Sequence, residues 1–289
     1  IHPSRRQIAK SATLILSPAN HSDILFSCNK FSKKPNHLGK VSPESFCRAS
    51  FFLSGSFSLI VKPTKLVMSV AAFECERDRE RVEINYKKRF SKGEYWYAWS
   101  IYLPKDHQSI WPALLNMVQF HTTKTDSYPF IMFKNGTSTV LNRGEKDDND
   151  LGGYALYNVV DGYNINRLLT EEQLLGRWND MLVNINWSHK DDGWIKAWAN
   201  DELVYEYNGP TKTKDYKAKF KFGIYRTYVS NWGGYQPSEW AKKKMKEKNI
   251  EIPKVNTKPI PTTVVYYDEI RIGSTKEKVV GKLSALDQP

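Results

Sequence analysis

The stretch Leu114-Leu115-Asn116-Met117-Val118-Gln119-Phe120-His121 predicts a β-strand, whose side chains alternate between two faces. Val118 and Phe120 fall on one face and would enter a core, while Gln119 and His121 share the other face. Histidine is the side chain best suited to exchange a proton near neutral pH, and an amide beside it can donate a hydrogen bond to an anion. The alternative is a plain polar pair at a strand end, so the rest of the chain decides between the two.

Runs of apolar and aromatic residues like this one recur along the chain, with turn residues between them. The clearest is 95–103, which is rich in Tyr and Trp and is stopped by Pro104. Strands at such spacing are typical of a β-sandwich or a β-barrel. We therefore predict an all-β protein with short helices inserted at 170–175 and 238–249. The other predicted strands are 12–16, 51–53, 57–61, 82–86, 130–133, 178–187, 193–198, 203–207, 219–226 and 263–273.

The composition is that of an ordinary globular protein with an excess of basic and aromatic residues. Of the 289 residues, 40% are hydrophobic and 13% are aromatic, and the formal net charge is +12. A basic protein suits an anionic partner, whether nucleic acid, a membrane surface or an acidic polysaccharide. The sequence has no nucleic-acid-binding motif and no apolar run of membrane-spanning length. We therefore expect an anionic polysaccharide as partner, although lysines such as those at 242–244 could serve solubility alone.

The predicted strand 219–226 carries a second polar pair opposite its apolar residues. Alternation puts Lys221 and Tyr225 on this polar face, with Gly223 between them, where a ligand could approach the backbone closely. Neighbouring strands of a sheet lie about 4.8 Å apart. If this strand is a neighbour of the opening one, its lysine and tyrosine meet the glutamine and histidine described above.

A third strand adds charged side chains of both signs. Arg79, Arg81 and Glu83 share one face of the segment that runs into the predicted strand 82–86. Guanidinium groups bind carboxylate or sulfate groups with two parallel hydrogen bonds, so these arginines are candidates for binding an acidic ligand. The alternative is a ladder of salt bridges with neighbouring acids.

These residue types favour one kind of polysaccharide chemistry over another. Hydrolysis of a glycosidic bond needs two carboxyl groups around that bond, and no convincing pair is found on one strand. Cleavage of a uronate polysaccharide by β-elimination needs a base for the C5 proton, an acid for the leaving oxygen, and cations that neutralise the sugar carboxylate. Histidine and tyrosine can move the protons, and glutamine, arginine and lysine can hold the carboxylate.

Several motifs together resemble the polysaccharide lyases of the heparin lyase I and glucuronan lyase type. Two of them are Gln119-Phe120-His121 and Lys221-Phe222-Gly223-Ile224-Tyr225-Arg226. The others lie at 81–83, 95–104, 176–180, 186–188, 193–200 and 266–273. Each motif is weak alone, but they occur in the order of the family between about residues 50 and 275. The lysine-rich segment 238–249 has no counterpart in the family that we can place.

The resemblance implies a β-jelly roll, a concanavalin-like sandwich of two sheets, with a concave groove. It also implies β-elimination with His121 and Tyr225 as the acid and base, in either order, and with Gln119 beside them. A non-catalytic jelly-roll module that binds acidic glycans is the alternative function. The residues expected to bind the substrate are Arg79, Arg81, Glu83, Asn116, Lys221 and Arg226.

Relatives of this type often hold Ca²⁺, and the acidic loop 145–150 offers oxygen ligands for such an ion. The loop lacks the spacing of a known calcium site, so a solvated turn is the alternative. We divide the chain into an extended N-terminal segment at 1–49, the lyase domain at 50–275 and a tail at 276–289. We expect a secreted or periplasmic monomer, and Cys28 with Cys47 is the disulfide to test.

Overall fold

The computed structural model describes residues 12–18, 47–52, 66–70, 78–124, 127–135, 152–214, 216–247, 249, 251–252 and 256–280. The predicted strand at 57–61, the acidic loop at 145–150 and the cysteine Cys28 lie outside the described residues. Within the described part, the chain forms two antiparallel sheets of seven strands each.

The first sheet has the strand order β12-β11-β10-β5-β14-β1-β2. The long central strands β5 and β10 pair over their whole length, and β14 lies on the other side of β5. The N-terminal strands extend this sheet, because β1 pairs with β14 and β2 pairs with β1. The bounds are β1 Ala12–Pro18, β2 Cys47–Phe52, β5 Gly93–Tyr102, β10 Trp178–Trp187, β11 Trp194–Ala199, β12 Glu202–Asn208 and β14 Thr263–Gly273.

The second sheet has the order β3-β4-β13-β6-β7-β8-β9. Its middle strands are those of the two predicted polar pairs, and they are direct neighbours although about a hundred residues separate them in the chain. The bounds are β3 Leu66–Val70, β4 Arg79–Phe90, β6 Leu114–Thr122, β7 Ile131–Asn135, β8 Tyr154–Asn158, β9 Asn164–Leu169 and β13 Ala218–Thr227.

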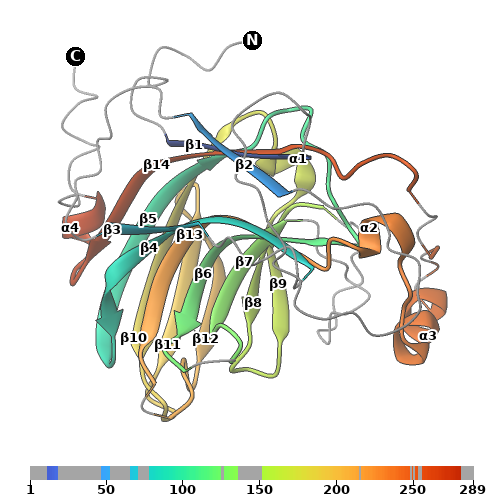
Figure 1. Ribbon diagram of the computed structural model, residues 1–289. Helices are drawn as coiled ribbons and strands as arrows, with labels where there is room; N and C mark the ends of the chain where they lie inside the picture. Colours follow the sequence, from blue (N-terminus) through green and yellow to red (C-terminus); the bar gives the residue numbers. More distant parts are fainter. Residues whose placement is uncertain are drawn as a thin grey trace, which may run out of the picture.

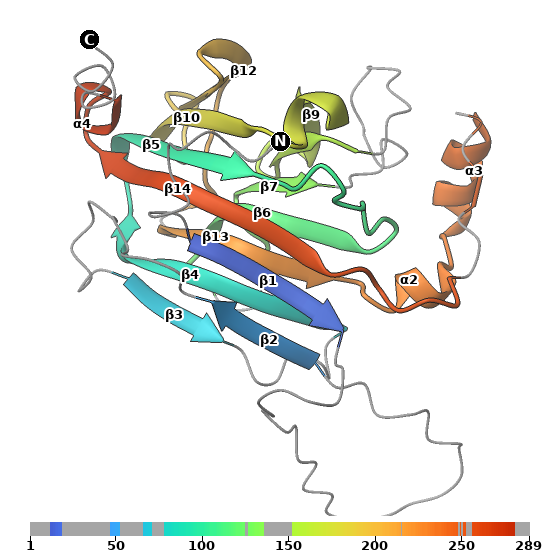
Figure 2. The same ribbon diagram turned by 90° about the horizontal axis from the view of Figure 1, so that it is seen from above.

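The two sheets stack as layers, and the chain passes repeatedly from one to the other (Figures 1 and 2). This arrangement confirms the predicted β-jelly roll with short helical insertions. The strands β3, β8 and β9 were not predicted. In β8 every side chain is buried, so this strand lacks the alternation of apolar and polar residues by which a strand is recognised in a sequence.

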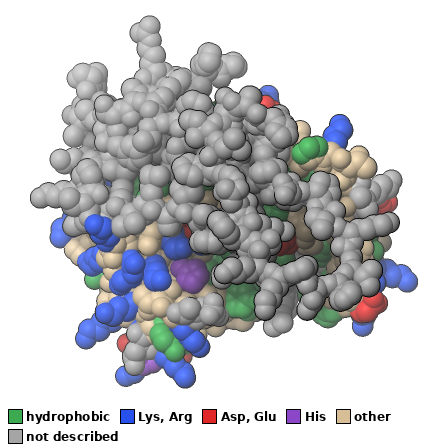
Figure 3. All heavy atoms as spheres, in the orientation of Figure 1, with side chains coloured by type: hydrophobic (Ala, Val, Ile, Leu, Met, Phe, Trp, Pro, Cys, Tyr) green, Lys and Arg blue, Asp and Glu red, His purple; other side chains and the backbone are tan. Residues whose placement is uncertain are grey.

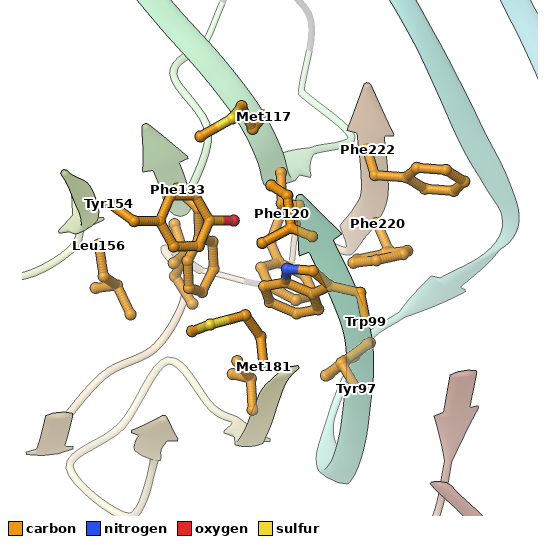
Figure 4. Packing of buried hydrophobic residues seen from close by; sticks show 14 of the residues in the cluster. Tyr97, Trp99, Met117, Phe120, Phe133, Tyr154, Leu156, Met181, Phe220 and Phe222 are labelled. Carbon is orange, nitrogen blue, oxygen red and sulfur yellow. The ribbon is translucent and has the colours of Figure 1, made fainter. Parts of the chain in front are cut away.

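Aromatic rings from both sheets fill the space between the layers (Figure 4). The Tyr97 ring of β5 lies 4.7 Å from that of Phe120, and Trp99 lies 5.0 Å from Phe133, both edge to face. Such pairs are the favoured geometry for aromatic quadrupoles. The apolar residues of β13 also point into this core, as alternation predicts. The opposite face of the second sheet carries polar side chains on β4, β13 and β6, whereas over β7 to β9 a smaller apolar cluster is buried there, formed by Met132, Ala155, Tyr157 and Ile165.

The helices are short and lie outside the two layers. They are α1 Glu171–Leu174, α2 Asn231–Gly234, α3 Glu239–Glu247 and α4 Glu277–Val280. Thr170 caps α1 in a capping box with Gln173, and the Ser238 hydroxyl accepts a hydrogen bond from the backbone of α3. The helices α1 and α3 confirm the predicted insertions. Among the helices of the described chain, none combines the length and the apolar character that a membrane span requires.

Candidate active site

The surface of the second sheet that faces away from the core is called the site face. Pairing across β4, β13 and β6 sets its residues side by side, with Lys221 opposite Gln119 and Lys219 opposite His121. Tyr225 lies opposite Arg81 on one neighbouring strand and opposite Asn116 on the other. The structure thus brings together on one face the residues Arg81, Glu83, Asn116, Gln119, His121, Lys221 and Tyr225.

Glu83 is the centre of this arrangement. Its side chain is 3% exposed, and Oε2 accepts from Arg81 Nη1 and from Lys221 Nζ, each at 3.3 Å. The other carboxylate oxygen accepts from Gln119 Nε2. Two cations around one buried anion leave a net charge of +1, and charge-assisted hydrogen bonds of this kind fix the side chains that make them. The cluster can therefore hold its shape and still attract one further negative charge.

Gln119 and Asn116 each offer an acceptor that the surrounding described residues do not satisfy. The Oε1 atom of Gln119 and the Oδ1 atom of Asn116 are buried and have no hydrogen-bond partner in the described structure. Their donors are engaged, since Gln119 donates to Glu83 and Asn116 donates to the Tyr225 carbonyl oxygen at 3.4 Å. Buried polar atoms are rarely left unpaired, so a hydroxyl-bearing ligand is a suitable partner for both oxygens.

A hydrogen bond to the backbone of the next residue, Thr122, fixes the tautomer of neutral His121. Its Nδ1 lies 2.9 Å from the carbonyl oxygen of Thr122, which can only accept, so Nδ1 carries the proton and Nε2 holds the lone pair of the neutral ring. Burial lowers the pKa of His121 below 6.5, and the Lys221 charge adds to this effect against the opposing Thr122 hydrogen bond. The ring is therefore neutral at neutral pH and can accept a proton at Nε2.

Tyr225 lies on the same face beside a cation. The guanidinium carbon of Arg81 is 4.8 Å from the centre of the Tyr225 ring. A cation over an aromatic ring is attracted to its electrons, and it would also stabilise negative charge that develops on the phenol oxygen. Tyr225 is thus placed as a proton donor on the site face, on the strand next to that of His121.

A β-bulge in β6 places Asn116 on this face. The pairing register with β7 changes between Asn116 and Val118. The pairing register with β13 changes at the same place, between Phe222 and Tyr225 of that strand. Met117 and Val118 consequently both enter the core. Strict alternation would put Asn116 on the face opposite Gln119. The extra residue reverses that assignment, which brings Asn116 beside Tyr225.

The glycine of β13 has a structural explanation that differs from the predicted one. Gly223 has φ +144°, and a Cβ atom there would meet the carbonyl oxygen of Val82 and lie 2.8 Å from the Cα of Glu83. The close approach that needs a glycine is therefore that of strand β4. In the structure, this approach lets β4 bring its arginine and glutamate against β13.

The structure does not bring Arg226 to the site face, so the prediction that it binds substrate is corrected. Its side chain is fully buried, forms an ion pair with Glu80 and donates to the Pro261 carbonyl oxygen at 2.8 Å. Alternation along β13 assigns this even-numbered position to the core side, with Phe222. Arg79, by contrast, lies on the exposed start of β4, opposite Thr227, and its role as a substrate ligand stays a prediction.

Basic side chains gather on the part of the surface that Figure 3 displays, around a histidine. Lys219 is a residue of the site that sequence reasoning missed, although it shares the face of Lys221 by simple alternation. Burial lowers the pKa of Lys219, and the charges of Arg89 and Lys221 lower it further. In the described residues, no three His, Cys, Asp or Glu side chains come together as a metal site, and the predicted calcium loop lies outside them.

Comparison with known proteins identifies the family to which this chain belongs. A family model described as polysaccharide lyase matches residues 36–271, which is most of the chain, so this chain belongs to the polysaccharide lyase family. It is accordingly a polysaccharide lyase, an enzyme whose substrate is a polysaccharide. A search of curated protein sequences gives no match.

Solved structures with a similar arrangement include lyases and a hydrolase at low sequence identity. An endo-β-1,4-glucuronan lyase from Trichoderma reesei is 18% identical, with a TM-score of 0.46, and the match covers 70% of this chain and 78% of that one. An alginate lyase from Pseudomonas aeruginosa is 10% identical, with a TM-score of 0.39 and coverage of 68% and 75%. The catalytic domain of a glycoside hydrolase family 131 protein from Coprinopsis cinerea is 14% identical, with a TM-score of 0.40 and coverage of 70% and 65%.

Proposed function

We propose that this lyase cleaves a uronate-containing polysaccharide by β-elimination on the site face. The observation that carries the proposal is the placement of His121 and Tyr225 on one face of adjacent strands, with the Arg81–Glu83–Lys221 cluster between them. A uronate is acidic at C5 only when its carboxylate is neutralised, because the negative charge spreads into that group as the proton leaves. The net positive charge of the cluster suits this task.

The proposed reaction uses the protonation states that the geometry favours. Nε2 of His121 takes the C5 proton of the uronate, since its lone pair is available while Nδ1 is engaged with Thr122. The electrons of the C5–H bond form the C4=C5 double bond, and the bond from C4 to the glycosidic oxygen breaks. The Tyr225 hydroxyl gives its proton to that oxygen, with Arg81 stabilising the charge left on the phenol.

The site residues divide into those that react and those that hold the substrate. His121 and Tyr225 move protons, while Arg81 and Lys221 face the sugar carboxylate. Gln119 and Asn116 accept hydrogen bonds from sugar hydroxyls through their unpaired oxygens. Glu83, predicted to contact substrate, serves here to orient the two cations and the glutamine.

The test is the ultraviolet absorbance of the conjugated double bond formed by elimination, measured on glucuronan, alginate, heparin and chondroitin. We expect the parent enzyme to produce this signal on at least one polyuronate. His121→Ala and Tyr225→Phe should each lower kcat by roughly a hundredfold or more, the contribution typical of a general acid or base.

Matched controls are His189→Ala and Tyr102→Phe, because His189 is exposed in the turn between β10 and β11 and Tyr102 lies on β5, both in the first sheet. They should keep parental activity, and all four variants should unfold at nearly the parental temperature. Parental kcat in either the His121 or the Tyr225 variant would refute the assigned roles. A parent that gives no absorbance rise on any of these four polysaccharides would refute the uronate substrate.

A further inference from the structure

Lys134 of β7 is a buried lysine on the site face that sequence reasoning did not single out. It pairs in register with Asn116 of β6, while its neighbour Phe133 enters the main core. The Lys134 side chain must therefore point to the opposite surface of the sheet, where Tyr225 and Asn116 lie. The residue is only 6% exposed.

This amine has no carboxylate partner among the described residues. It contacts an aromatic ring instead, since Nζ lies 4.3 Å from the centre of the Tyr157 ring. Burial lowers the pKa of Lys134 to about 8. A buried ammonium group without a counter-ion is costly, so a site that keeps one is suited to a ligand that brings negative charge.

The position of Lys134 relative to the cluster fits a repeating anionic ligand. The order of strands is β4-β13-β6-β7-β8, so the cations of Arg81 and Lys221 lie on one side of β6 and Lys134 lies on the other. Lys221 and Lys134 are two strands apart, roughly 10 Å across the sheet, and their partners on β6, Gln119 and Asn116, are offset along that strand. A polyuronate carries one carboxylate on every uronate, so a chain laid obliquely across these strands meets a cation on both sides of β6.

We propose that Lys134, together with Asn116 and Tyr157, forms a second carboxylate-binding subsite that holds a uronate next to the sugar that is cleaved. The Lys134 ammonium binds the carboxylate, the unpaired Oδ1 of Asn116 accepts from a hydroxyl, and the Tyr157 ring lies beside the amine. This subsite rests on the proposed function, because it needs a substrate with more than one uronate.

The first experiment measures steady-state kinetics of Lys134→Met, a substitution that keeps the length and removes the charge. KM for the polyuronate should rise roughly tenfold to a hundredfold, the loss expected for one charge-assisted contact, while kcat changes far less. Lys134→Arg should recover part of this loss. Lys196→Met, a partly exposed lysine of the other sheet that pairs with Glu206, serves as the control and should match the parent.

The second experiment measures binding directly, by calorimetry in the Tyr225→Phe background, where we expect cleavage to be slowed roughly a hundredfold or more. Lys134→Met should weaken binding of a tetra-uronate but leave binding of its carboxyl-reduced analogue unchanged. Equal weakening for both ligands, or for neither, overturns the subsite. If the parent lacks activity on every polyuronate, the proposed function is refuted, and the subsite that rests on it is refuted with it. If the parent is active and Lys134→Met matches it in KM and binding, the subsite alone is refuted.

Discussion

Two glutamates of β4, the buried Glu83 and the half-buried Glu80, stabilise cations on opposite faces of the sheet. Glu83 accepts hydrogen bonds on the site face and organises Arg81 and Lys221. Glu80 neutralises Arg226, which has no exposed surface. One carboxylate thus prepares cations for a ligand, and the other stabilises an arginine where no ligand can reach. The face on which each residue lies, set by alternation, decides between these roles.

The pH dependence of kcat/KM should report the protonation of His121. As a base it must be neutral, and burial, with the added effect of the Lys221 charge, holds its pKa below 6.5. Activity should therefore persist to a pH below 6.5 and fall only at more acidic values. Lys221→Met removes a cation that disfavours the protonated ring, so the acid limb should move to higher pH.

The measurement is kcat/KM on a polyuronate as a function of pH, with Lys196→Met as the control that should keep the parental limb. If Lys221 contacts substrate, Lys221→Met lowers kcat/KM at every pH. The informative quantity is therefore the pH at which kcat/KM falls on the acid side. A limb at or above pH 6.5 in the parent, or an unmoved limb in Lys221→Met, would contradict His121 as the base.

At the scale of elements, the β-bulge of β6 is stabilised from the opposite sheet. The Tyr267 hydroxyl of β14 is buried and lies 2.9 Å from the Met117 carbonyl oxygen and 2.8 Å from that of Gly223. Register is irregular at these two positions, so the hydroxyl satisfies carbonyl groups that the sheet pairs imperfectly. The core side of the second sheet thereby fixes the backbone under Asn116 and Tyr225.

We expect Tyr267→Phe to lower both stability and kcat. Loss of the hydroxyl leaves two buried carbonyl groups without this donor, at a cost of about 1–3 kcal/mol, and loosens the backbone that positions Tyr225. Urea unfolding and steady-state kinetics measure the two effects. Tyr97→Phe is the matched control, because it removes a buried hydrogen bond with Trp187 from the same core without touching the bulge. An equally large loss of kcat in Tyr97→Phe would show that the effect of Tyr267→Phe does not come from the bulge.

At the scale of the whole molecule, the net charge of +12 should guide a polyanion to the site face. Many of these charges lie outside the cluster that contacts one sugar. Salt screens interactions between exposed charges over about 10 Å at 0.1 M ionic strength. The long-range attraction is therefore sensitive to salt, whereas the buried contacts around Glu83 are screened much less.

Raising the ionic strength should consequently raise KM for a long polyuronate and leave kcat nearly constant. A short oligouronate that covers only the site should show a weaker change, because it meets fewer of the distant charges. Kinetics of both substrates over a salt series provide the comparison. Equal salt dependence for the long and the short substrate would locate the attraction in the site itself.

The sequence alone determined the all-β class, most strand positions, and the faces of β13 and β4, because alternation is a local property of an extended chain. It also indicated His121, Tyr225 and their lyase-like motifs. Only the tertiary structure made β4, β13 and β6 neighbours, since strand pairing joins segments far apart in the chain. Two further features depend on packing between strands, which no local pattern encodes. They are the bulge that turns Asn116 to the site face and the burial of Lys134 next to Asn116.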